Sequence, residues 1–384
     1  MYSHSDIEEA VASGALTADQ AASLRNFVAR RTGTPTADEE HVRWLQGFND
    51  YYVFASSIVL IIGLGWLGSK IEVGRGPSFF IPLLIGLASW GLSEYFVAKK
   101  RLALTGITLA FVLVYSTYFT VMLLAAQALG SSSGPETGKI VSMISALVAA
   151  GVAFMHWKRF DEPVAISLIA GAGAIALMSL LSLVASNDPE GTVAFLVLTL
   201  IGLGTLFYAQ IWEARDIHRT SRKADIAFWL HMTAAWETLI GLSGLIGLTQ
   251  GYISQGAAIG AIVLFIVAVL AGLVFDRRVW VLGAAWPFGA GLYTLIRGDR
   301  GGYSPYGGGY GDYGSSYGGY SPYGMGGGSS TDSIMLTVLI VGVILVVLGM
   351  FWTQIRGALG GLAAPLAGKV PPTSHTQNEG QTFE

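Results

Sequence analysis

The sequence contains no cysteine and few charged side chains, and both shortages narrow the class of protein. Without cysteine there is no disulfide framework, no thiolate metal site and no thiol nucleophile. Charged residues make up 12% of the 384 residues, against about 25% in an ordinary soluble domain. That is too few charges to cover a globule of this size.

Signals of several functional classes are also absent. The six histidines show no metal-ligand spacing, and no G-x-S-x-G, H-E-x-x-H or P-loop pattern occurs. The sequence therefore predicts neither a metal site nor a bound cofactor, and it favours a non-enzymatic role. A net charge of −3 argues against nucleic acid as a partner.

What the chain has instead is long apolar blocks, which bring the hydrophobic content to 52%. A stretch of about 20 apolar residues is long enough to cross the hydrocarbon core as a helix. We predict an all-α polytopic membrane helix bundle of about ten transmembrane helices, with the lipid bilayer as its surroundings. The expected spans are 51–69, 79–98, 102–124, 139–157, 163–185, 192–212, 225–248, 256–275, 279–296 and 333–355.

The span at 279–296 has the weakest signal, because it is short and carries Pro287 among several glycines. A kinked or re-entrant element is the alternative there.

The distribution of Lys and Arg predicts the orientation of the bundle. Cytoplasmic loops carry an excess of these residues. With a cytoplasmic N-terminus, most of the 22 Lys and Arg residues fall on the cytoplasmic side. The outer side receives Lys70, Arg75, Lys139, Arg297 and Arg300. This alternation predicts a membrane protein with both termini in the cytoplasm, and it requires 279–296 to cross.

Residues 1–50 precede the first span, and we predict that they form a helical hairpin in the cytoplasm. They contain no apolar stretch typical of a signal peptide, so we expect the first span to serve as the insertion signal. Thr17 and Gln20 fit a capping box, and Gly14 lies where a helix stop is expected. The remaining regions are a membrane domain at 51–296, an outer loop at 297–332, the last span at 333–355 and a cytoplasmic tail at 356–384.

The outer loop is rich in glycine and tyrosine, and the segment YSPYG occurs in it twice. Glycine at this density opposes a packed core, so the loop is predicted to be disordered and periplasmic. The simplest interpretation is a flexible connector, and the alternative is a surface that contacts glycans through aromatic rings. The tyrosines concerned are Tyr303, Tyr306, Tyr310, Tyr313, Tyr317, Tyr320 and Tyr323.

Ionisable side chains within the predicted spans are the candidate functional residues, because burying them in a bilayer is costly. Glu237 falls near the centre of 225–248, on a stripe with Thr233, Gly241 and Gly244 that we expect to face another helix. Tyr115 has a similar depth on 102–124 and is a candidate donor to its carboxylate. The alternative is a structural role, in which Glu237 stays protonated and makes one interhelical hydrogen bond.

A second candidate set lies near the cytoplasmic face. Glu94 and His231 have comparable shallow depths and would pair if their two spans were neighbours. Asp50, at the beginning of the first span, belongs to the same face. Each residue is also open to interpretation as an interfacial anchor.

Several segments together resemble an uncharacterised family of bacterial multi-pass inner-membrane proteins that carry an N-terminal helical pair. They are "DIEEAVASGALTADQAASL", "DEEHVRWLQGFNDYYVFA", "WGLSEYFVAKKRLAL", "DIAFWLHMTAA", "DRRVWVLGA" and "LVVLGMFWTQIRGALGGL". The resemblance implies the topology and the compartment rather than an activity. The family motifs contain Asn49, Asp50, Glu94, Asp225, His231, Asp276, Arg277 and Arg278. This chain departs from the family pattern at Trp236 and Glu237, where Pro and Leu usually follow the two alanines.

Three functions remain open from the sequence. The leading hypothesis is a transporter-like or solute-sensing membrane protein. The second is a membrane scaffold or signalling protein that binds a cytoplasmic partner through residues 1–35. The third is an intramembrane enzyme with Glu94 and His231 as an acid/base pair.

Overall fold

The structure is a computed structural model in which all regular elements of the described residues are α-helices, as expected. It describes residues 7, 10–17, 19–21, 23–24, 48–70, 78–130, 134–184, 191–216, 219, 222–250, 253–297 and 330–358. The tyrosines of the outer loop and residues 359–384 of the tail lie outside this part of the chain.

Each predicted span corresponds to a helix. The helices are α3 (Phe48–Gly68), α4 (Phe80–Phe96), α5 (Ala103–Leu129), α6 (Pro135–Phe160), α7 (Val164–Val184), α8 (Thr192–Glu213), α9 (Arg222–Leu245), α10 (Gln255–Phe275), α11 (Val279–Arg297) and α12 (Ser330–Met350). A short helix, α13 (Trp352–Ala358), follows. The last span was therefore predicted too long, because the helix stops at Met350 and begins again at Trp352.

Within the described residues, eight helices are long and apolar enough to cross a membrane. Helix α4 is apolar but shorter, with 17 residues. Helix α9 has 24 residues, and its charged and polar side chains lower its apolar character. These apolar helices make the chain an integral membrane protein with a polytopic helix bundle.

Helix α11 answers the question raised by Pro287. It is one continuous helix of 19 residues with Pro287 in its interior. Pro287 is fully buried, and its missing N–H costs the helix one backbone hydrogen bond. Helix α11 is also one of the helices that are long and apolar enough to cross a membrane.

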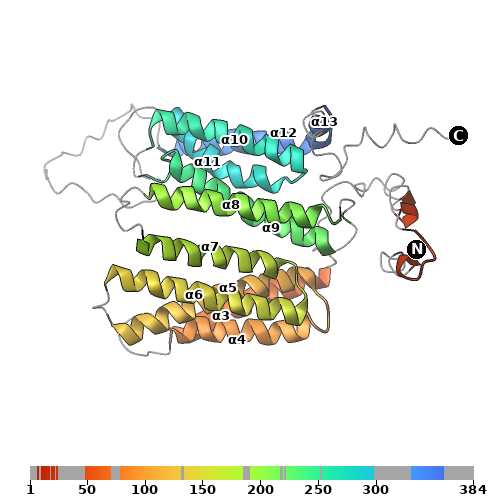
Figure 1. Cartoon of the computed structure of the whole chain (residues 1–384), viewed down its shortest axis with the longest axis vertical. Coiled ribbons are helices and arrows are strands. Elements are labelled where there is room, and N and C mark those ends of the chain that lie inside the picture. The colour runs from red at the N-terminus through yellow and green to blue at the C-terminus, as the bar shows by residue number, and fades with distance from the viewer. Residues whose placement is uncertain are drawn as a thin grey trace.

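The helices lie side by side in a row along the longest axis of the molecule (Figure 1). Helices α3, α4, α5 and α6 gather at one end of the row, and α10, α11 and α12 gather at the other. Helix α7 packs against α5 and α6 on one side and against α8 and α9 on the other. The bundle is therefore two groups, α3–α7 and α8–α13, that meet where α7 contacts α8 and α9.

Alternating helix directions bring most described Lys and Arg residues to one end of the bundle, which we call the basic end. They are Lys99, Lys100, Arg101, Lys158, Arg159, Arg215, Arg219, Arg222, Lys223, Arg277, Arg278 and Arg356. Lys70, Lys139 and Arg297 lie at the opposite end. Helix α13 is on the side of the basic end in Figure 1.

Part of the N-terminal segment is also described, and it confirms the predicted capping box. The backbone N–H of Thr17 donates to Gln20 Oε1 at 3.0 Å, and the N–H of Gln20 donates to Thr17 Oγ1 at 3.2 Å. Gly14 has a φ of +76°, the left-handed conformation expected of a helix stop.

Candidate functional site

The close contact between α8 and α9 determines where Glu237 lies. A Cβ atom on Gly202 would stand 2.4 Å from Thr238 Oγ1, and one on Gly241 would stand 2.3 Å from Thr199 Oγ1. Only glycine allows the two backbones to approach so closely, as in other small-residue helix interfaces. The predicted small stripe on α9 therefore faces a helix, and Glu237 is held beside it.

Glu237 is 7% exposed and is only partly satisfied by hydrogen bonds. The hydroxyl of Thr205, on α8, donates to Glu237 Oε2 at 2.7 Å. Tyr115, the candidate donor from the sequence, makes no hydrogen bond to this carboxyl group, and the bond from Thr205 is the single interhelical hydrogen bond of the alternative interpretation. The second oxygen, Oε1, is buried and has no hydrogen-bond partner within the described residues. Buried polar atoms are nearly always satisfied, so this oxygen is available to a partner that is not among the described residues.

Glu237 lines a cavity of about 1180 Å³, which we call the chamber. Its walls come from α5, α6, α7, α8 and α9, so it lies where the two groups of helices meet. Cavities of this size in proteins accommodate drug-sized or larger ligands. Most of the lining is apolar or aromatic, and Glu237 is the one carboxylate among the residues that line it.

The chamber is not fully enclosed by the helices around it. Five of the large side chains that line it are also substantially exposed: Tyr115, Phe119, Ile175, Trp236 and Ile240. All five lie within predicted spans, and part of their exposed surface forms the wall of the chamber itself.

Polar groups concentrate in the part of the chamber away from the basic end. The hydroxyls of Tyr118, Ser142 and Ser179 form a chain of two hydrogen bonds, each of 2.9 Å, across α5, α6 and α7. Lys139 Nζ donates to the carbonyl oxygen of Ser182 at 2.7 Å. These contacts bring a positive charge and several hydroxyls to one end of the chamber.

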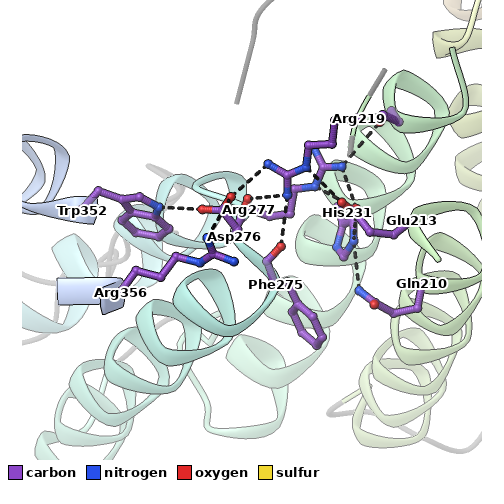
Figure 2. Close-up of polar contacts among 10 residues, drawn as sticks. Gln210, Glu213, Arg219, His231, Phe275, Asp276, Arg277, Trp352 and Arg356 are labelled. Atoms are coloured by element: carbon purple, nitrogen blue, oxygen red, sulfur yellow. Dashed lines mark hydrogen bonds and ion pairs between the residues drawn. The ribbon is translucent and has the colours of Figure 1, made fainter. Parts of the chain in front are cut away.

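A second polar feature is a buried network at the basic end, which we call the Glu213 cluster (Figure 2). Arg277 donates to Glu213 Oε2 through Nε at 3.0 Å and through Nη2 at 2.6 Å. Arg219 donates to Glu213 Oε1 at 3.1 Å and to Asp276 Oδ2 at 3.0 Å. The two carboxylates are thus joined through arginine.

The Glu213 cluster extends to the C-terminal helix α13. Trp352 Nε1 donates to Asp276 Oδ1 at 3.0 Å, and Arg356 Nη1 lies 3.5 Å from Asp276 Oδ2. Arg356 also donates to the carbonyl oxygen of Leu273 at 3.3 Å. Through these paired and buried charges, the cluster ties α8, α10 and α13 together.

His231 belongs to the Glu213 cluster and is completely buried. Its Nε2 lies 3.4 Å from Glu213 Oε2, and Trp280 Nε1 donates to its Nδ1 at 3.4 Å. An indole N–H is only a donor, so Nδ1 acts as the acceptor in this contact. Glu94, the partner predicted from the sequence, instead accepts two hydrogen bonds from Arg159, at 3.0 and 2.7 Å. The predicted pairing of Glu94 with His231 is therefore wrong.

Asp50 stabilises the beginning of α5. Its carboxylate accepts from the backbone N–H groups of Leu104 at 3.0 Å and Thr105 at 3.1 Å. The Thr105 hydroxyl donates to it as well, at 2.9 Å. These amides belong to the first turn of a helix, which has no intrahelical acceptor for them. Asp50 is 2% exposed and acts as a cap between α3 and α5.

Glu162 follows α6, outside the spans, and its surroundings are acidic. A Cβ on Gly106 would stand 2.9 Å from Glu162 Oε1, so the carboxyl group lies against the first turn of α5. The pKa of Glu162 is raised to about 7, chiefly by burial; Arg222 opposes this shift, and the nearby carboxylates Asp161, Asp50 and Asp225 contribute to it.

Three kinds of site residue were not predicted from the sequence. Thr205 and Lys139 were not selected, because a threonine or a terminal lysine in a span carries no distinct signal. Glu213 was overlooked, although it is the last residue of the apolar helix α8. Glu94 had been selected because it lies near the end of its own span. Asp276 and Arg277 appeared only as parts of a family motif.

Comparison of the chain with models of protein families, with curated proteins and with solved structures finds no match in any of the three.

Proposed function

We propose that this membrane protein binds an amphipathic solute in the chamber, as a transporter-like or solute-sensing protein of the bacterial inner membrane. The observation that carries the proposal is Glu237 Oε1, a buried oxygen without a partner in the described chain, in the wall of a large cavity. A polar group on a bound solute would supply the missing hydrogen bond.

The position of the chamber supports a role in transport or sensing. It lies between α3–α7 and α8–α13, and substrate sites of many transporters lie between two helical groups near the bilayer midplane. Movement of one group against the other would change the shape of the chamber. Carboxyl groups at such depth also serve proton relays in transporters, so Glu237 is the residue we propose for coupling.

Orientation is a further part of this proposal. We place the basic end in the cytoplasm, which puts the Gly/Tyr-rich loop at 297–332 in the periplasm. The positive-inside rule supports this arrangement. A periplasm-specific reporter inserted at residue 315 should be active, and the same reporter after residue 384 should be silent. The reverse pattern would overturn the orientation.

The resemblance to the uncharacterised inner-membrane family is retained as a proposal of membership. Its motif "DRRVWVLGA" contains Asp276 and Arg277, and both bind partners in the Glu213 cluster. A structural tie is a reason for a family to share these residues.

The binding proposal is tested by filling the chamber. Gly171 lines it, and a Cβ there meets no atom within 4 Å. We expect Gly171→Phe to remove small molecules or lipids that copurify with the full chain, as detected by native mass spectrometry. Gly151→Phe is the matched control, because Gly151 also has open space but lies outside the lining. Equal retention by both variants would refute binding in the chamber.

Two experiments separate the alternatives. If Glu237 couples a cargo, Glu237→Gln abolishes flux while the protein still folds. If the protein is a scaffold, deletion of residues 1–35 causes the defect and Glu237→Gln is silent. The enzymatic hypothesis relied on a pair of Glu94 and His231, and those residues have different partners.

A further inference from the structure

The chamber is long as well as large, and its length suggests the kind of molecule it holds. On α7 its lining runs from Ser182 to Ser167. Fifteen residues at 1.5 Å each give about 22 Å along the helix. That is roughly three quarters of the hydrocarbon core, which is about 30 Å thick. A compact solute would fill little of this length, whereas an extended hydrocarbon chain would occupy it.

The two ends of the chamber have opposite chemistry. Near the basic end the lining is formed by Phe111, Leu168 and Trp229, and these three side chains belong to one hydrophobic cluster. At the other end lie Lys139 and the hydroxyls of Ser142 and Ser179. A ligand that matches this lining has a hydrocarbon tail at one end and a polar group at the other.

Lys139 determines the charge expected of that polar group. Its ammonium group has three N–H donors. Two of them donate to the carbonyl oxygen of Ser182 at 2.7 Å and to Glu136 Oε1 at 3.1 Å. Glu136 is an exposed partner, with 56% of its side chain accessible, so this ion pair adds little. An anion at the end of the chamber would gain a charge-assisted hydrogen bond from Lys139.

Glu237 lies between the two ends. It precedes Leu245, the last residue of α9, by eight residues, or about 12 Å along the axis. A lipid carries ester or hydroxyl groups just below its head group. A lipid hydroxyl would donate to Oε1 when Glu237 is ionised, and a protonated Oε1 would donate to an ester carbonyl, so either group would satisfy the oxygen that the described residues leave without a partner.

We infer that the occupant of the chamber is a membrane lipid with an anionic head group. The head group binds at Lys139, and one hydrocarbon chain runs along α7 to Phe111, Leu168 and Trp229. The lipid enters sideways, between the exposed side chains of Tyr115 and Trp236. This inference rests on the proposed function, because it names the class of solute that the chamber binds.

The test uses the full chain in nanodiscs and a photoactivatable group at the end of an acyl chain. One sample contains labelled phosphatidylglycerol and the other contains labelled phosphatidylcholine. We expect phosphatidylglycerol to modify Phe111, Leu168 or Trp229, as located by peptide mass spectrometry, with about a tenfold preference over phosphatidylcholine, which corresponds to 1.4 kcal/mol.

Variants of Lys139 test the recognition of the head group. Lys139→Gln should remove the preference, and Lys139→Arg should keep it. Lys70→Gln is the control, because Lys70 is a cation at the same end whose ammonium group lies over the ring of Trp66, 5.5 Å from its centroid. A thermal unfolding measurement on each variant shows that the fold is retained.

The outcomes distinguish this inference from the proposed function. Equal labelling of the chamber by both lipids, or an unchanged preference in Lys139→Gln, overturns the anionic head group and leaves binding in the chamber intact. Labelling restricted to lipid-facing residues such as Leu200, with none in the lining, overturns both.

Discussion

The Thr205 hydroxyl donates to Glu237 at 2.7 Å across the contact between α8 and α9, and it satisfies one oxygen of a carboxyl group buried in a membrane protein. The other oxygen faces the same low-dielectric surroundings without a partner in the described chain. This asymmetry holds the carboxyl group in place while leaving one oxygen for a ligand.

Removing the Thr205 hydroxyl should therefore destabilise the protein. Thr205→Val leaves both Glu237 oxygens without a donor, and we expect a loss of about 1–3 kcal/mol. Thr205→Ser keeps the hydroxyl and should restore most of this stability. Thr294→Val is the control, because Thr294 donates only to the carbonyl oxygen of Ala290 in its own helix. Reversible unfolding in detergent measures the differences, and equal losses in the two valine variants would contradict the prediction.

The close approach of α8 and α9 should not tolerate a methyl group. In Gly241→Ala the new Cβ would stand 2.3 Å from Thr199 Oγ1 and 2.7 Å from Thr199 N. A backbone atom cannot rotate away, so the helices must separate, at a cost of about 1–3 kcal/mol. Gly63→Ala meets nothing within 4 Å and should be neutral or slightly stabilising. Thermal unfolding compares the two variants, and equal midpoints would refute the tight contact.

The Glu213 cluster should respond strongly to the loss of one partner. Arg277→Met leaves Glu213 buried with less compensation, and breaking such a pair costs about 3–5 kcal/mol. Arg159→Met removes the partner of Glu94 from a pair whose side chains are 54% and 36% exposed. Exposed pairs contribute about 0–1 kcal/mol. Unfolding in denaturant should rank the two variants in this order, and a similar cost for both would argue against a buried tie.

Stability should fall as the pH rises through the range where Glu162 titrates. Its pKa is about 7, against an ordinary value of 4.5. The folded protein therefore binds more protons than the unfolded chain between these values. The stabilising contribution is complete below pH 4.5 and is lost as the pH rises through about 7. Asp161, Asp50 and Asp225 repel the ionised form, and Arg222 attracts it.

Glu162→Gln should flatten this pH dependence of the unfolding midpoint, because the amide does not titrate. Glu94→Gln is the control and should leave the slope in place, since Glu94 is paired with Arg159 elsewhere at the basic end. If the unfolding midpoint of Glu162→Gln depends on pH as strongly as that of the unmodified protein, another titrating group causes the pH dependence.

Much of the fold follows from the sequence because it depends on local properties. Apolar blocks of sufficient length predicted helices at every position where α3 to α12 occur, and the capping box of Thr17 and Gln20 was confirmed. The alternation of basic residues also predicted which helix ends would lie together. Each of these signals is contained within one segment of chain.

The partners of the polar side chains were decided by the tertiary structure alone. The sequence predicted comparable depths for Glu94 and His231, but Glu94 binds Arg159 and His231 contacts Glu213. Depth follows from position along one helix, whereas pairing depends on which helices are neighbours. The chamber follows the same rule, because its walls come from five helices. The hydropathy of a segment indicates whether it forms an apolar helix. It does not indicate which faces of the helices pack against one another.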